Sequence, residues 1–210
     1  MARLSQNREP AVPSSPAQIE RYRRILQVVR ELTTARGEDA VQMQDVAQEA
    51  DVALNTLYRY FPSKSHLYAA VLASELERLR DHAPTRRGPK ASRDPERAVL
   101  AVIESATDAL LSRPLLASAM LNAVNGTAVG GSSDASRVDD AMRAAVLQAA
   151  GIEHPTEGDH RMVYVILLGW SAALTAVLNG RLEREEARAQ IDLLVTQLLQ
   201  VRSTLADRAS

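Results

Sequence analysis

Apolar residues recur every three or four positions along almost the whole chain. From Pro16 to about Leu205, no stretch alternates apolar and polar residues for long enough to form a sheet. A period near 3.6 residues lines up side chains on one face of a helix, whereas a strand has a period of two. The sequence therefore predicts an all-α fold. It shows no repeat of about 20 to 50 residues, which would indicate a helical solenoid.

Start and stop residues divide this pattern into helices. Ser15 and Pro16 form a helix start, Gly37 a stop, and Pro62 ends one helix before Ser63 caps the next. The expected helices span about residues 16–36, 43–50, 54–60, 64–80, 95–112, 114–125, 133–150, 157–179 and 184–205. Residues 1–15 lack apolar periodicity and contain two prolines, so they predict a disordered arm.

Two of these helices are short and separated by three residues, which is the pattern of a helix-turn-helix. In residues 54–61 the helical period buries Leu57 and Phe61 and leaves a polar outer face. That face comprises Asn55, Thr56, Tyr58 and Arg59. A solvated surface and a nucleic-acid interface both fit the shape alone. Hydroxyl and amide groups bond phosphate oxygens and base edges, and no acidic residue lies between Val52 and His66, which favours DNA.

Charge and composition set weaker limits. The formal net charge is −1, so binding to DNA would depend on a local patch such as Arg21 to Arg24. The chain has no cysteine, and its N-terminus lacks the apolar core of a secretory signal, so we expect a cytoplasmic protein. The apolar run from Met162 to Leu178 is interpreted as a buried helix rather than a membrane span.

The segment from Met43 to Leu72, MQDVAQEADVALNTLYRYFPSKSHLYAAVL, resembles the DNA-binding signature of the TetR family of bacterial transcriptional regulators. The matching positions are Val46-Ala47, Val52, Thr56-Leu57-Tyr58, Tyr60-Phe61, Lys64 and Leu67. The resemblance implies a helix-turn-helix DNA-binding domain at residues 16–64, with the fourth helix as a connection to about residue 80. It also implies a helical ligand-binding and dimerisation domain at residues 65–210, and a homodimer on a palindromic DNA operator.

The family pattern also implies roles for individual residues. Thr56, Tyr60 and Lys64 match phosphate-contacting positions. The positions that face base edges in the major groove are matched by Gln44, Leu54, Asn55 and Tyr58. Two residues depart from the pattern: Asp51 replaces the usual glycine of the turn, and Gln42 replaces the usual threonine cap. Asp tolerates a left-handed backbone, whereas Gln weakens the cap of the second helix.

Beyond residue 80 the chain is most similar to the KstR type of that family, the regulators of steroid and cholesterol catabolism. The segments RPLLASAMLNAV and GGSSDASRVDD support this similarity. It implies a repressor released by a small apolar effector, such as a steroid or an acyl-CoA. The large side chains expected around the pocket are Leu116, Met120, Met142, Tyr164 and Trp170. Each of them also fits ordinary core or dimer packing.

The last two helices are the expected dimer surface. Ile191, Leu194, Val195, Leu198 and Leu199 form an apolar stripe on the final helix. A regulator without an effector, whose C-terminal domain only dimerises, remains the alternative. Enzyme motifs in the sequence are incomplete, and no cofactor is indicated. We expect no metal at His154, Glu157, Asp159 and His160, whose pattern is typical of a solvated loop.

Overall fold

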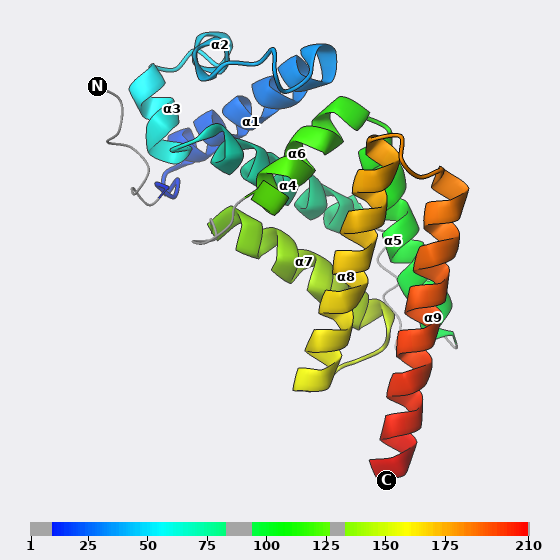
Figure 1. The fold of residues 1–210 in the computed structure, drawn as a ribbon. Helices are drawn as coiled ribbons and strands as arrows, with labels where there is room; N and C mark the ends of the chain where they lie inside the picture. The colour runs from blue at the N-terminus through cyan, green and yellow to red at the C-terminus, as the bar shows by residue number, and fades with distance from the viewer. Residues whose placement is uncertain (1–9, 83–93, 127–132, 210) are drawn as a thin grey trace. The chain divides into compact units, whose positions relative to one another are not determined.

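A computed structural model describes residues 10–82, 94–126 and 133–209, and all regular structure in these residues is α-helical (Figure 1). The helices are α1 Pro16–Arg36, α2 Met43–Glu49, α3 Leu54–Tyr60, α4 Lys64–His82, α5 Pro95–Leu111, α6 Pro114–Gly126, α7 Ser133–Ala149, α8 Glu157–Leu178 and α9 Arg184–Ala209. The expected all-α fold is confirmed. Residues 1–9 of the expected disordered arm lie outside the described residues.

The contacts of the backbone divide the chain into two compact units. Unit 1 comprises residues 1–75 and 113–138, and unit 2 comprises residues 76–112 and 139–210. Helices α1 to α3, the first part of α4 and α6 therefore belong to unit 1, while α5, α8 and α9 belong to unit 2. Unit 1 therefore contains the short helices α2 and α3 together with α6.

Unit 1 is organised around α1, which packs against α2 and α6. Ser15 caps α1 as expected, because its hydroxyl accepts a hydrogen bond from the Gln18 amide at 3.3 Å. In the core, the hydroxyls of Thr33 and Tyr68 lie 2.9 Å apart and both residues are buried. Burial raises the pKa of Tyr68 above its ordinary value, although the Thr33 hydrogen bond opposes this. Tyr68 is therefore a neutral phenol that satisfies a buried polar partner.

Unit 2 is built on the pairing of α8 with α9, which lie side by side in Figure 1. Gly169 permits their close approach, since a Cβ at this position would lie 2.5 Å from Cδ2 of Leu194. By length and composition, α8 is apolar enough to cross a membrane. It buries Val163, Ile166 and Trp170 inside the protein, and it packs against α5 as well as α9.

One acidic residue joins the ends of α8 and α9. The Asp159 carboxylate accepts hydrogen bonds from the Thr156 amide at 2.8 Å and from Nε of Arg202 at 2.5 Å. Burial alone would raise the pKa of Asp159, but these hydrogen bonds outweigh it and lower the pKa to about 2. The start of α8 at Glu157 agrees with the helix expected over residues 157–179, whereas the expectation of a solvated loop is wrong for Asp159, which is only 5% exposed.

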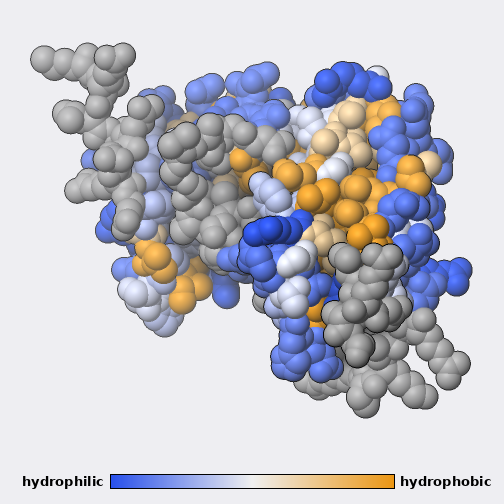
Figure 2. Space-filling view, turned by 60° about the horizontal axis from the view of Figure 1, so that its bottom comes forward, coloured by the Kyte–Doolittle hydropathy of each residue, from blue (hydrophilic) through white to orange (hydrophobic). Residues whose placement is uncertain are grey.

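Unit 2 also keeps large apolar side chains at its surface. On α8, Tyr164, Val165 and Leu168 are 52%, 45% and 53% exposed, and their spacing places them on one face of the helix. Apolar residues also gather on the face of the molecule shown in Figure 2. Three such residues within about one turn are more than the isolated apolar residues that any protein surface contains.

Candidate nucleic-acid interface and effector pocket

The turn between α2 and α3 is made by one residue in the left-handed region. Asp51 has φ +49°, and it is the non-glycine residue with positive φ in the described part of the chain. The Val52 amide then donates to the Ala47 carbonyl at 2.9 Å, which closes the end of α2. Arg24 of α1 donates to the Asp51 carbonyl at 3.5 Å. Asp51 therefore adopts the conformation expected where the family pattern has glycine.

The start of α2 is also secure despite the unusual cap. The Gln42 amide donates to the Asp45 carboxylate at 3.1 Å, and α2 begins at Met43. Asp45 thus contributes half of a capping box from inside the helix. Asp45 compensates for the missing threonine, and this compensation could have been found from the sequence because Asp45 stands three residues after Gln42.

The inner face of α3 is fully buried. Leu57 and Phe61 have no exposed surface, and the Tyr22 ring of α1 lies 5.0 Å from the Phe61 ring. Val46 of α2 is also fully buried. The rotation of α3 about its own axis is therefore set by apolar packing, so the residues on its opposite face are held outward.

The residues expected to face base edges are on the outer surface. Gln44 of α2 and Asn55 and Tyr58 of α3 are exposed, and Leu54 is partly exposed. None of these side chains is committed to a hydrogen bond that the structure records among the described residues. Amide and phenol groups on one outer face are suited to base edges and thymine methyl groups.

The residues expected to contact phosphate are placed differently from one another. Lys64 begins α4 and donates from Nζ to the Glu38 carbonyl at 2.6 Å. Thr56 is partly exposed, whereas Tyr60 is 2% exposed and packs its ring on Tyr22 at 5.9 Å. The hydroxyl of Tyr60 accepts a hydrogen bond from Arg59 at 3.3 Å. For Tyr60, a phosphate contact would have to come from this hydroxyl edge.

Arg59 is a further candidate that the family pattern did not select. Its guanidinium lies 5.1 Å from the centroid of the Tyr60 ring, and the residue is exposed at the end of α3. The Arg59 carbonyl accepts the Ala11 amide at 2.9 Å, so the segment before α1 is attached beside it. An exposed arginine fixed over an aromatic ring has the geometry of a phosphate ligand. Its place on the outer face of residues 54–61 was the available signal.

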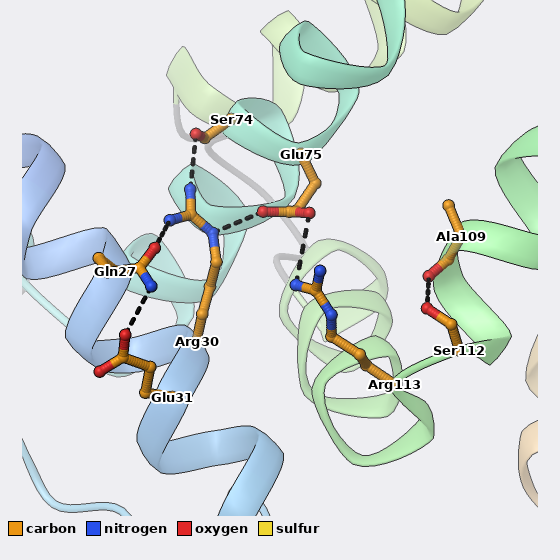
Figure 3. A network of polar contacts seen from close by, with 8 residues as sticks. All are labelled: Gln27, Arg30, Glu31, Ser74, Glu75, Ala109, Ser112 and Arg113. Atoms are coloured by element: carbon orange, nitrogen blue, oxygen red, sulfur yellow. Dashed lines mark hydrogen bonds and ion pairs between the residues drawn. The ribbon is translucent and has the colours of Figure 1, made fainter. Parts of the chain in front are cut away.

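A buried ionic network supports the helices behind this surface (Figure 3). Arg30 of α1 is 8% exposed, and its Nε lies 2.5 Å from the Glu75 carboxylate of α4. Its other nitrogens donate to Ser74 at 2.8 Å and to Gln27 at 3.0 Å. Arg113 reaches the second oxygen of Glu75 at 3.7 Å. A charge this deeply buried is tolerated only with such partners, so the network specifies how α1 packs on α4.

Unit 2 contains a pocket of about 250 Å³ between α5, α8 and the start of α9. Its apolar part includes Ile103, Leu174 and Ile191. Trp170 lines it and donates from Nε1 to the Thr107 hydroxyl at 2.8 Å. The pocket is compact for a ligand site, whose usual volume is about 300 to 1,000 Å³.

Of the expected pocket residues, Trp170 alone lines this pocket. Leu116 and Met120 of α6 are buried in unit 1, and Met142 of α7 is buried in unit 2. Tyr164 is on the exposed face of α8. Charged residues such as Arg184 and Arg188 also line the pocket, and the sequence did not indicate this role. Charged residues are common on surface helices, so their presence in a sequence does not indicate a pocket.

Comparison with known proteins agrees with this architecture. Residues 25–71 match the model of bacterial regulatory proteins of the tetR family, and residues 93–198 match a tetracyclin repressor-like C-terminal domain. The KstR repressor of Mycolicibacterium smegmatis is 34% identical over 88% of this chain and 90% of its own length. The KstR repressor of Rhodococcus jostii is 35% identical over 89% and 86%, respectively.

Solved structures give the same result. A TetR regulator from Rhodococcus sp. RHA1 has 38% identity and a TM-score of 0.81 over 87% of this chain and 97% of its own. Thermus thermophilus FadR, solved with lauroyl-CoA, shares the fold at 16% identity and a TM-score of 0.61, over 85% and 93% of the two chains. The chain therefore belongs to the TetR family, whose members with these matches are DNA-binding transcriptional regulators rather than enzymes.

Proposed function

We propose that this protein is a cytoplasmic, ligand-responsive repressor that binds a palindromic DNA operator as a homodimer and leaves it when a small apolar molecule binds. The observation that carries the proposal is the outer face of α3. Asn55 and Tyr58 are exposed there, on a helix held by the fully buried Leu57 and Phe61. The names of the KstR relatives, which are repressors, support the direction of regulation.

The proposed DNA contacts fall into two groups. Thr56, the hydroxyl of Tyr60 and Lys64 hold phosphates, and Arg59 joins them on geometric grounds. Gln44, Leu54, Asn55 and Tyr58 face the base edges and determine sequence preference. Phosphate contacts contribute affinity for any sequence, whereas contacts to base edges discriminate between sequences.

The proposed homodimer uses α8 and α9. On α8 the exposed Tyr164, Val165 and Leu168 supply the apolar surface. Of the stripe expected on α9, Ile191 and Val195 are buried within their own subunit, and Leu194, Leu198 and Leu199 are partly exposed. These partly exposed leucines, together with Leu193 and Val201, which are 63% and 55% exposed, supply the proposed dimer surface on α9. Pairing two copies across a two-fold axis would remove these residues from water.

The effector is proposed to be apolar, with steroids and acyl-CoA compounds as the first compounds to test. The KstR similarity supports the steroid, and the lauroyl-CoA bound to Thermus thermophilus FadR supports the acyl-CoA. An effector must bind the DNA-free arrangement more tightly than the DNA-bound arrangement to cause release. Half-sites one helical turn apart, about 34 to 36 Å, make DNA binding sensitive to the spacing of the two subunits.

The test begins with the intergenic DNA beside the gene for this protein. Purified protein should shift a fragment that contains a palindrome at nanomolar concentration, and should not shift a scrambled fragment. Steroids and acyl-CoA compounds are then titrated into the complex. Absence of any preferred palindrome would refute the operator proposal, and unchanged affinity with every apolar compound would favour the regulator without an effector.

A further inference from the structure

Helices α5 and α9 are joined by polar pairs at intervals of four residues. The pairs are Arg184 with Asp108, Arg188 with Glu104 at 2.6 Å, and Thr196 with Glu96. Each step of four residues forward on α9 matches a step of four backward on α5, so the two helices are antiparallel along one face each. By the same spacing, Asp192 of α9 lies opposite Leu100 of α5. The series of polar pairs is interrupted there.

The pocket of unit 2 lies at this interruption. Both Asp192 and Leu100 line it, as do the two arginine–carboxylate pairs that precede them. Within the described residues, the structure records no ion pair that includes Asp192. Asp192 is partly buried, so its carboxylate is less hydrated than one on an open surface. Asp192 is thus an acidic group that lines the pocket, and no basic partner is recorded for it in the part of the chain that the structure describes.

The charge at the mouth of the pocket is negative. Four carboxylates line the pocket and two guanidinium groups balance half of them. These residues are Glu104, Asp108, Glu185 and Asp192, with Arg184 and Arg188. Both arginines are already paired with carboxylates of α5. A negative mouth repels an anionic head group and attracts a cation.

The interior of the pocket suits a hydrocarbon body. Ile103, Leu174 and Ile191 are nearly buried and apolar, and Trp170 adds an aromatic ring. Because Nε1 of Trp170 is bonded to Thr107, the indole is fixed in orientation. A fixed aromatic ring also attracts a nearby cation through its negative face.

We propose that this pocket is an effector site for a compact apolar molecule with one positively charged group. The hydrocarbon part packs on Ile103, Leu174 and Trp170, and the charged group pairs with Asp192. The assignment rests on the proposal that the protein responds to an effector, and it names a compact cation as an effector class to test beside steroids and acyl-CoA compounds. The carboxylates at the mouth repel the several negative charges of a coenzyme A thioester, and the volume of about 250 Å³ suits a compact hydrocarbon body.

Trp170 makes the binding step measurable without DNA, because it is the one tryptophan in the sequence. We would titrate the full-length protein with 1-adamantylamine, 1-adamantanecarboxylate and 1-adamantanol, which share one hydrocarbon body and differ in charge. The amine should change the Trp170 fluorescence at the lowest concentration, at least about fivefold below the alcohol and further below the carboxylate. Tightest binding of the carboxylate or the alcohol, or no response to any of the three at millimolar concentration, overturns the proposal.

Asp192→Asn tests the partner of the charged group. It should weaken binding of the amine at least about fivefold and leave binding of the alcohol unchanged. Glu186→Gln is the matched control, since it removes one negative charge from an exposed position of the same helix that does not line the pocket. An equal loss in both variants would show a general effect of charge and would overturn the role of Asp192.

The failure of this inference can be told apart from the failure of the proposed function. Fluorescence reports on the pocket, whereas operator binding reports on regulation. If the amine binds and Asp192→Asn abolishes the preference, but operator affinity stays constant, the site is correct and regulation through it is wrong. If the amine does not bind while a steroid or lauroyl-CoA releases the operator, the proposed function stands and this pocket assignment is wrong.

Discussion

At the scale of single residues, the structure separates positions where the backbone decides from positions where the side chain decides. Asp51 is exposed, and its role is to accept φ +49° in the turn before α3. Asn55 is also exposed, but its backbone is ordinary helix, which many other residues would adopt equally well. Substitutions at the two positions should therefore affect stability and DNA binding in opposite proportions.

Substitution of Asp51 should change stability according to the backbone conformation of the new residue. Asp51→Gly should leave the free energy of unfolding within about 0.5 kcal/mol, because glycine adopts positive φ freely. Asp51→Val should lower it by about 1 to 3 kcal/mol, since a β-branched residue is strained there. Urea unfolding of the two variants is the measurement. Equal stability of the two would show that Asp51 does not hold this conformation in solution.

Lys64→Ala and Asn55→Ala should differ in their dependence on salt. The lysine change removes a phosphate partner, so affinity should fall for all sequences and the salt slope should decrease by about one. Lys64 also donates a hydrogen bond to the Glu38 carbonyl, so the melting temperature of the Lys64→Ala variant must be compared with that of the wild type to detect any loss of stability. Tyr60→Phe should behave as a weaker version of the lysine change, with no effect on the salt slope.

The change at Asn55, and likewise Gln44→Ala, should cost about 1 to 3 kcal/mol on the cognate operator and much less on random DNA. Their salt slopes should stay unchanged because neither amide is charged. Fluorescence anisotropy at several salt concentrations separates the two patterns. A uniform loss from Gln44→Ala would place α2 away from the major groove.

At the scale of helices, the contact of α8 with α9 depends on small and charged residues as much as on apolar ones. Gly169 allows Leu194 to approach, and Asp159 holds Arg202 near the other end of the pair. The pKa of the Asp159 carboxyl in the folded protein is about 2, compared with 3.8 for an ordinary Asp, so the group stays ionised to lower pH. This difference makes the pairing of α8 and α9 dependent on pH.

Asp159 should stabilise the fold above about pH 4 and lose this effect between pH 4 and pH 2. Since the folded pKa is the lower one, the unfolded chain takes up the proton first, and acid favours unfolding. Asp159→Asn should therefore lower the free energy of unfolding by about 2 kcal/mol at pH 7, with a smaller difference near pH 2. Urea unfolding across this pH range is the measurement.

Glu157→Gln is the control for this effect. Glu157 pairs with Arg161, but both side chains are about three-quarters exposed, so its loss should be within about 0.5 kcal/mol at every pH. A pH-independent difference between wild type and Asp159→Asn would mean that Asp159 contributes by packing and not by its charge.

At the scale of the whole molecule, the apolar face of α8 is the main surface to be covered by a partner. Tyr164, Val165 and Leu168 are each about half exposed, which is costly for a surface in water. A second copy of the chain is the proposed cover. Replacing one residue on this face by a charged residue should therefore prevent dimer formation without changing the fold of the subunit.

Leu168→Glu should convert the protein to a monomer at micromolar concentration. The control is Leu115→Glu on α6, because Leu115 is exposed to nearly the same extent, 51% compared with 53%, and belongs to unit 1. Light scattering on the eluted protein gives the mass directly, and circular dichroism checks the helix content. Dimers for both variants, or a wild-type monomer, would contradict the proposed pairing through α8.

The sequence by itself determined the features that depend on local chemistry. Neighbouring residues alone specify the helical period, the Ser and Pro at helix starts, and the position of Asp51 between α2 and α3. The order of the helices and the outward face of Asn55 and Tyr58 were therefore predicted from the sequence. The family similarity followed from the same short segment and is confirmed over most of the chain.

The tertiary structure decided what depends on residues far apart in the sequence. Three features each require two helices to meet: the burial of Tyr60, the ion pair of Arg30 with Glu75, and the hydrogen bond from Arg202 to Asp159. No local pattern specifies which residues then face each other. The same holds for α9, where one apolar stripe contains the buried Ile191 and Val195 and the partly exposed Leu198. Helical periodicity identifies an apolar face, but the packing of neighbouring helices determines whether that face is core, pocket or surface.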